Sequence, residues 1–210
     1  YTKEDVPENI NTNYLLDTDL EDQLAYLTSQ NYYFPSYKEL YAYIKGEIDL
    51  PEKSIILTFD DGQKGFLEYG IPLLEKYQVP ATSYIIASKN GEEKVDEYRS
   101  DYLVYESHSH NMHRPGGNIG HGGVFTAISE EEGMADLKES IKICGSEEAF
   151  AYPFGDYNVG SRDMVEEADY LCAVTTEYGK ARPGTDPLLL PRIRMVMGQS
   201  LESFKDKVSP

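Results

Sequence analysis

Short apolar runs alternate along the chain with segments whose apolar residues recur every three or four positions. The run Ser54–Phe59 is mostly apolar and ends at an Asp-Asp-Gly turn, as is typical of a strand buried on both faces of a parallel sheet. The same pattern predicts six strands, at 54–59, 81–87, 101–106, 149–152, 171–175 and 188–194. Such alternation indicates a parallel α/β architecture, either an open sheet or a barrel. Six strands are few for an eight-fold barrel, so a barrel here would be incomplete or distorted.

Helix starts are marked by Ser or Thr residues that stand three positions before a Glu. These capping patterns begin at Thr18, Ser36 and Ser129. The helix that begins after Ser129 is expected to stop at Gly145, and a last helix is expected near 200–208. No repeat or long linker interrupts the chain, so we expect an extended N-terminal arm over residues 1–17 and a single domain over 18–210.

Composition and charge narrow the classes of partner. The net charge of −18 disfavours nucleic acids and anionic membranes, since both would be repelled. No apolar run is long enough to span a bilayer, and because the chain begins with Tyr1 we expect a leader or anchor to be absent from it. The 18 tyrosines suit stacking on sugars, although many are equally expected to line mixed surfaces. Cys144 and Cys172 are two thiols or one disulfide, and we favour separate thiols.

The first candidate site is the acidic pair Asp60-Asp61, which directly follows a predicted buried strand. Adjacent carboxylates repel each other unless a cation or hydrogen-bond donors offset their charge. One carboxylate can bind a metal ion while its neighbour accepts a proton from water. An acidic turn is the competing interpretation, because Asp-Gly is a common turn dipeptide.

The second candidate site is the segment Glu106–His113, which holds three of the four histidines of the chain within six residues. Imidazole is a common ligand of zinc and similar ions. Either His108 with His113 or His110 with His113 would supply two ligands, and a His-rich surface loop is the third interpretation. Two imidazoles and one carboxylate would leave open positions on a metal for water and substrate, as a catalytic site requires.

These residues carry a resemblance to a known family. Ile56–Gly62 resembles the first signature of the polysaccharide deacetylases, carbohydrate esterase family 4, and Ser107–His113 resembles their histidine motif. The five-residue spacing of His108 and His113 is similar to the branch that acts on poly-N-acetylglucosamine in biofilms. Further segments similar to that branch are 150–155 and 190–194, and the resemblance extends from about Thr18 to Phe204.

The resemblance implies a distorted (β/α) barrel over residues 18–210 and a role for each motif residue. Asp60 would be the general base, and Asp61, His108 and His113 would bind the metal. The ion would polarise the water and the acetamide carbonyl, and the backbone N–H of Phe154 would help to stabilise the oxyanion. Zinc is the default metal for such ligands, with cobalt or nickel as alternatives.

The sequence departs from the family pattern in its third motif. That motif usually carries an Arg that orients the catalytic base, whereas here Phe150–Tyr152 precedes Pro153. Arg192 or Arg194 would then orient Asp60 or the substrate, unless both form surface salt bridges.

The last family motif is also incomplete. It usually supplies a His as general acid, but no His follows His121. We therefore consider His110 or His121 as the group that protonates the leaving amine. Tyr152, His110 and Arg114 are expected to contact substrate, although a flexible loop is the favoured interpretation of the Gly-rich segment that contains Arg114. The stretch 87–101 is shorter than in relatives and is expected to lack a helix.

The sequence thus predicts a metal-dependent hydrolase that removes N-acetyl groups from an N-acetylglucosamine-containing polysaccharide. By the same resemblance, it would work outside the cell or at the cell envelope. A glycan-binding protein that has lost catalysis is one alternative, because the motif Arg and the late His are absent. An esterase acting on O-acetyl groups, as in acetylated xylan, is another.

Overall fold

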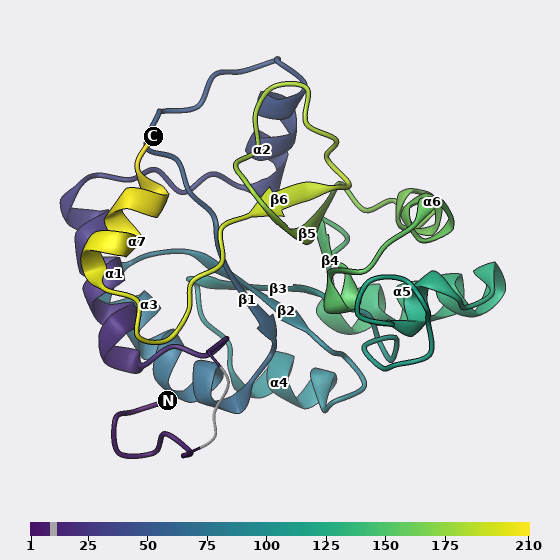
Figure 1. Cartoon of the computed structure of the whole chain (residues 1–210), viewed down its shortest axis with the longest axis horizontal. Coiled ribbons are helices and arrows are strands. Elements are labelled where there is room, and N and C mark those ends of the chain that lie inside the picture. Colours follow the sequence, from purple (N-terminus) through teal and green to yellow (C-terminus); the bar gives the residue numbers. More distant parts are fainter. Residues whose placement is uncertain (9–11) are drawn as a thin grey trace.

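The computed structural model describes residues 1–8 and 12–210, which form a curled sheet surrounded by helices (Figure 1). All neighbouring strands are parallel and follow chain order, from β1 at one edge to β6 at the other. The strands are β1 Leu57–Asp61, β2 Ala81–Ile85, β3 Leu103–Ser107, β4 Ala149–Ala151, β5 Cys172–Tyr178 and β6 Leu190–Arg192. The sheet curls into half a barrel, which confirms the prediction of a single-domain, incomplete (β/α) barrel.

Helices pack on both faces of the sheet. They are α1 Asp17–Ser29, α2 Tyr37–Ile44, α3 Ile71–Tyr77, α4 Gly91–Glu97, α5 Glu130–Cys144, α6 Val159–Glu167 and α7 Leu201–Val208. Helices α1, α3, α5 and α6 lie on the outer face, and α2 lies on the inner face. One apolar cluster joins α1 and α3 to the first three strands, and a second joins α5 and α6 to β4 and β5. Because helices cover one face and the curl encloses the other, every residue of β2 is buried.

The inner face of the curl forms a third apolar cluster with helix α2. Tyr37 of α2 packs there against Tyr84 of β2 and against small or aliphatic residues of the last three strands. The Tyr37 hydroxyl lies 2.7 Å from the Tyr84 hydroxyl and donates a 3.0 Å hydrogen bond to Thr82 Oγ1. The interior of the half-barrel therefore contains hydrogen-bonded hydroxyl groups, and Tyr84 is paired with Asp60 near the end of β1.

Two of the three predicted capping patterns are confirmed. Ser36 forms a complete capping box with Glu39, and Ser129 caps α5, which ends at Gly145 in the left-handed conformation. The prediction for Thr18 is wrong, because α1 already begins at Asp17 and its N-cap is Leu16. The Asp17 N–H donates to the Tyr1 carbonyl, so a tertiary contact supplies the partner that a capping side chain would have given.

A second correction concerns the stretch 87–101, where we expected no helix and where α4 is found. Its sequence Gly-Glu-Glu-Lys-Val-Asp-Glu has no apolar periodicity, so packing rather than pattern stabilises it. Gly91 begins the helix against α5, and a Cβ added there would lie 3.0 Å from Ile143 Cγ2. The close approach of the two helices therefore depends on the missing side chain.

The start of the N-terminal segment lies against the residues that lead into α1. The Tyr1 amino group donates to the Leu15 carbonyl at 3.2 Å, and the Tyr1 ring contacts Tyr14 edge to face. Cys144 and Cys172 are buried free thiols, as favoured from the sequence. Among the described residues, no helix has both the length and the apolar character needed to cross a membrane.

Glu106 in the barrel interior provides a test of the buried polar network. It is 2% exposed and accepts hydrogen bonds from Ser146 Oγ and the Ala149 N–H. Burial raises its pKa to about 7, above the usual 4.5 of an unfolded chain. The contribution of Glu106 to stability is therefore complete below pH 4.5 and is lost as the pH rises through about 7.

Glu106→Gln is expected to leave stability unchanged at pH 4.5 and to raise the free energy of unfolding at pH 8, by at most about 3 kcal/mol. Urea unfolding of both proteins in the presence of a chelator measures this difference. Glu131→Gln, which removes the same charge from the exposed surface, controls for the net charge. An equal gain from Glu131→Gln would show that the effect does not come from the interior carboxyl.

Candidate active site

The acidic pair and the histidine cluster meet because the strands that precede them are parallel and close in the sheet. Asp60 is paired with Tyr84 of β2, which is paired with Glu106 of β3. The His108 N–H continues this register by donating to the Ile85 carbonyl at 2.9 Å. Asp60 and Asp61 at the carboxyl end of β1 and the histidines that follow β3 therefore lie at the same end of the sheet, the one where the strands finish.

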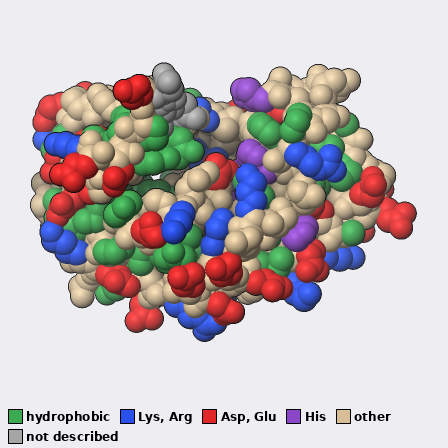
Figure 2. Space-filling view, turned by 90° about the horizontal axis from the view of Figure 1, so that it is seen from below, with side chains coloured by type: hydrophobic (Ala, Val, Ile, Leu, Met, Phe, Trp, Pro, Cys, Tyr) green, Lys and Arg blue, Asp and Glu red, His purple; other side chains and the backbone are tan. Residues whose placement is uncertain are grey.

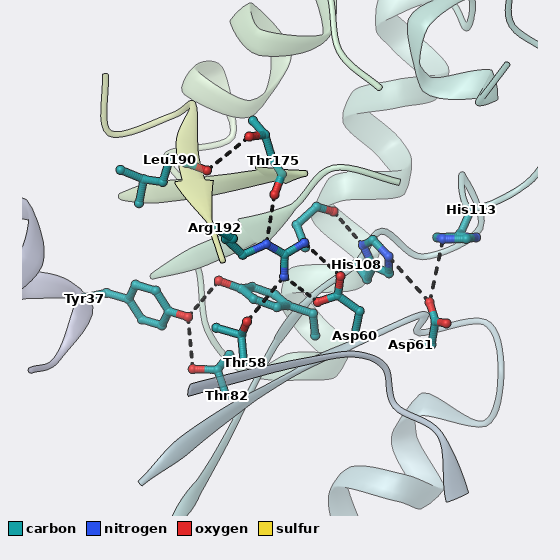
Figure 3. Close-up of polar contacts among 12 residues, drawn as sticks. Tyr37, Thr58, Asp60, Asp61, Thr82, His108, His113, Thr175, Leu190 and Arg192 are labelled. Carbon is teal, nitrogen blue, oxygen red and sulfur yellow. Dashed lines mark hydrogen bonds and ion pairs between the residues drawn. The ribbon is translucent and has the colours of Figure 1, made fainter. Parts of the chain in front are cut away.

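Asp61, His108 and His113 converge on one point at this end of the sheet (Figure 3). Asp61 Oδ1 lies 3.6 Å from His108 Nε2 and 3.7 Å from His113 Nε2. One donor atom from each residue lies within 4.8 Å of the other two. Ligands around a tetrahedral zinc ion are separated by roughly 3.3 Å, so a small inward movement would complete such a site.

The orientation of the His108 ring is fixed by a hydrogen bond on the side of the ring that is turned away from Asp61. Its ring is almost completely buried, and its Nδ1 lies 2.7 Å from the Ala151 carbonyl oxygen of β4. A carbonyl can only accept, so Nδ1 carries the proton and Nε2 presents its lone pair toward Asp61. This tautomer is the one that a metal ligand needs.

His113 is held by rings on two sides. Its ring centroid lies 4.6 Å from that of His108 and 4.4 Å from that of Phe154, on which it is stacked. Burial lowers the pKa of His113, and the neighbouring His108 lowers it further, although Asp61 opposes the change. His113 therefore favours the neutral imidazole that can bind a metal.

Backbone geometry explains why His113, and not His110, joins His108. Ser109 has a left-handed φ of 69°, which turns the chain sharply at the end of β3. Ser107 Oγ accepts the Ser109 N–H, and Ser109 Oγ accepts the Met112 N–H, so the turn is hydrogen-bonded internally. Met112 is fully buried and anchors the returning loop. The His110 N–H is directed to Asp136 of α5 instead.

Asp60 is bound by Arg192 of β6 in a two-pronged ion pair. Arg192 Nη1 and Nη2 donate to the two Asp60 carboxylate oxygens, each at 2.8 Å (Figure 3). Arg192 Nε donates to the Thr175 carbonyl, and Nη1 also lies 3.3 Å from Thr58 Oγ1. Burial alone would raise the pKa of Asp60, but Arg192 outweighs it and lowers the pKa to about 2. Asp60 is therefore ionised at neutral pH.

Strained backbone accompanies these side chains. Asp61 and Phe154 have left-handed φ values of 73° and 61°, which are uncommon for residues other than glycine. Gly62 follows Asp61 with φ 59°, and a Cβ there would lie 2.7 Å from Ile85 Cγ2. Glycine is thus required where the chain leaves β1 beside the neighbouring strand.

The site opens into a cavity of about 1490 Å³ that Asp60, Asp61, His113 and Arg192 help to line. Figure 2 shows a face of the molecule that is hollowed, with hydrophobic side chains around the hollow and histidines beside it. Acidic side chains are spread over the rest of this face, in keeping with the net charge of −18.

The structure locates the residues that we expected to contact substrate. His110 and Arg114 are not among the cavity-lining residues, and Arg114 Nε donates to the Asn111 carbonyl. Tyr152 borders the cavity, but its side chain is 1% exposed and packs among aromatic rings of the core. A sugar could therefore meet only a small edge of Tyr152.

Sequence reasoning missed two residues of the cavity region. Tyr14 lines the cavity, and burial raises the pKa of its hydroxyl, with Tyr1 and Asp61 adding to the effect. Nothing in the sequence pattern marked this tyrosine. Asp156 is a buried carboxylate that holds the loop containing His121. Its position directly after the Tyr-Pro-Phe-Gly segment was the available signal.

Comparison with known proteins agrees with this geometry. The chain is 27% identical over 190 residues to a poly-beta-1,6-N-acetyl-D-glucosamine N-deacetylase of Staphylococcus aureus, covering 82% of this chain and 64% of that protein. A Staphylococcus epidermidis protein of the same name is 26% identical over 205 residues, which cover 90% of this chain and 70% of that one. The chain thus spans somewhat less than two thirds of the Staphylococcus aureus relative.

Solved structures share the fold. A Streptococcus pyogenes deacetylase in complex with acetate is 25% identical, with a TM-score of 0.82 over 96% of this chain and 90% of that one. IcaB from Ammonifex degensii is 21% identical, with a TM-score of 0.75 over 93% of this chain and 90% of that one. The family model "Polysaccharide deacetylase" matches residues 47–173, which hold the acidic pair, the histidine cluster and Phe154. The chain therefore belongs to the polysaccharide deacetylase family.

Proposed function

We propose that the protein is a metal-dependent hydrolase that removes N-acetyl groups from a polysaccharide containing N-acetylglucosamine. The observation that carries this proposal is the convergence of Asp61, His108 and His113 beside a carboxylate, Asp60, that is held by an arginine. Family membership and the names of the staphylococcal relatives support the reaction and the substrate. By the same similarity, we place the enzyme outside the cell or at the cell envelope.

The donor set fits a divalent transition ion. Two neutral imidazoles and one carboxylate suit zinc, and they also suit cobalt and nickel. The Nε2 atoms of both histidines are directed toward Asp61, so the three residues would hold the ion on one side and leave its other side to the cavity. We propose zinc as the metal.

A divalent ion bound there would increase the acidity of water and polarise the acetamide carbonyl. Asp60 would accept the proton of the attacking water. Arg192 keeps this carboxylate ionised and fixes both of its oxygens, so the base would not need to reorient during the reaction.

Phe154 would stabilise the oxyanion through its backbone. It lies in the first turn of the short helix Pro153–Gly155, where backbone N–H groups lack partners within the helix. Its left-handed conformation and its stacking on His113 fix the direction of this peptide group. An N–H held in place beside the metal ligands is suited to a tetrahedral oxyanion.

Chelator-treated protein supplied with zinc, cobalt or nickel should release acetate from N-acetylglucosamine oligomers. Asp60→Asn should lower kcat by about 10²–10⁴-fold, because the base is lost, while the bound metal is retained. The exposed Asp22→Asn variant provides a control for removal of one carboxylate. Sugar binding without acetate release under all three metals would contradict the proposal. Faster release from acetylated xylan than from the oligomers would redirect it to O-acetyl esters.

Metal affinity provides a separate test of the ligand assignment. His108→Gln, His113→Gln and Asp61→Asn should each weaken zinc binding by about 100-fold or more, since each removes one of three ligands. His110→Gln, the competing histidine, should leave affinity unchanged. Isothermal titration calorimetry with zinc measures all four variants. A loss in His110→Gln equal to that in His108→Gln would refute this ligand set.

The role of Arg192 can be tested with a substitution that keeps the charge. Arg192→Lys cannot donate to both Asp60 oxygens and to Thr175 together, so kcat on the oligomers should fall by about 10–100-fold. Zinc affinity should change little, because Arg192 donates to Asp60 and not to the ligands. Arg194→Lys is the matched substitution two residues away. Equal losses in both arginine variants would show that the loss does not come from the contact with Asp60.

A further inference from the structure

Hydrolysis of an amide needs a proton for the departing nitrogen as well as a base for the water. Asp60 would take a proton, and Arg192 stays charged because the ion pair with Asp60 outweighs the effect of burial and raises its pKa. His108 and His113 would bind the metal through their Nε2 atoms. Apart from Asp60 in the form that has already taken the proton of water, the residues assigned so far give the amine no proton donor.

His121 borders the same cavity as Asp61 and His113 and has no role in the site described above. Its side chain is 72% exposed, and its Nδ1 lies 3.3 Å from Asp156 Oδ1. Its backbone N–H donates to both Asp156 oxygens at 2.9 Å, and the Gly123 N–H donates to Oδ2 at 2.9 Å. One carboxylate thus holds both the backbone and the imidazole of His121.

Asp156 is suited to hold an imidazole ring. Its side chain is 4% exposed. Burial would raise its pKa, but the N–H groups of Gly123 and His121 outweigh burial and lower the pKa, so the carboxylate stays ionised. A buried, ionised carboxylate that contacts one ring nitrogen fixes the orientation of the imidazole and leaves the other nitrogen, Nε2, available to the cavity.

The His121 loop is packed against the metal site through Phe154. Gly123 lies so close to the Phe154 ring that an added Cβ would be 2.9 Å from Cδ2. The same ring is stacked on His113 at a centroid distance of 4.4 Å. At Gly120, an added Cβ would lie 1.9 Å from Asp156 Oδ1, so the loop follows the carboxylate closely. Two glycines therefore let the loop approach both Asp156 and the ring beside the metal ligands.

We propose that His121, positioned by Asp156, is the catalytic acid that protonates the leaving amine, an inference that rests on the proposed N-deacetylase function. When the C–N bond of the tetrahedral intermediate breaks, its electron pair stays on nitrogen. The nitrogen takes the proton of His121 Nε2, giving the sugar amine and acetate. The neutral His121 regains a proton from solvent, and Asp60 releases to solvent the one that it took from water. The exposure of the ring allows this exchange in every turnover.

Tyr14 also lines the cavity and interacts electrostatically with Asp61. Burial raises its pKa above the usual 10, so its hydroxyl is a weak acid at neutral pH. The His121 ring is exposed to solvent and is held by Asp156, so it can regain a proton after each transfer and is the better-placed donor for this step.

Two substrates with different leaving groups can distinguish a catalytic acid role of His121 from a purely structural role. In His121→Gln, kcat for acetate release from N-acetylglucosamine oligomers should fall by about 10²–10⁴-fold. Hydrolysis of 4-nitrophenyl acetate should stay within about twofold of the wild-type rate, since its phenolate departs without a proton. Asp156→Asn should show the same selective loss to a smaller extent. Asp169→Asn, an exposed carboxylate distant in sequence, is its control.

Equal loss on both substrates, or a raised KM with unchanged kcat, would overturn the acid role of His121. Wild-type acetate release by His121→Gln would overturn this inference and leave the proposed function standing. Failure of the wild-type protein itself to release acetate from the oligomers would overturn the proposed function, and the inference with it.

Discussion

The ion pair between Arg192 and Asp60 joins the two edges of the sheet. Asp60 lies on β1 and Arg192 on β6, the first and last strands of the half-barrel that the described residues form. The guanidinium also bonds Thr58 of β1 and Thr175 of β5, so one side chain bridges the gap that further strands would fill in a complete barrel. The same contact ionises and orients the proposed base. The ion pair between Arg192 and Asp60 therefore both joins the first strand to the last and holds the proposed base in place.

The proposed metal ligands depend on a different constraint, the register of β1, β2 and β3. Because these strands are parallel and adjacent, the residues at their carboxyl ends lie together at one end of the sheet. The β4 carbonyl of Ala151 then fixes the His108 ring, and Phe154 stacks on His113. Both histidine ligands are thus oriented by groups from a later part of the chain, as sites with preset geometry require.

Several features were readable from residue pattern because local rules govern them. Buried parallel strands need continuous apolar runs, and the Ser36 and Ser129 caps satisfy backbone groups within a few residues. Other features escaped because distant contacts control them. Helix α4 forms through packing of Gly91 on α5, and α1 begins at Asp17 through a bond to Tyr1. Tyr152, expected to meet substrate, turns into the aromatic core.

The sequence by itself determined the fold class, the acidic pair and the presence of a two-histidine site, because strand order and motif spacing are properties of the chain. The residue pattern left open which histidines pair, although the family resemblance pointed to His108 and His113, and it left open which arginine meets Asp60. Those choices came from tertiary structure. The left-handed Ser109 turns His110 toward Asp136 and returns His113, and the curl of the sheet brings Arg192 across to β1. Both depend on packing between segments far apart in sequence, which no local pattern encodes.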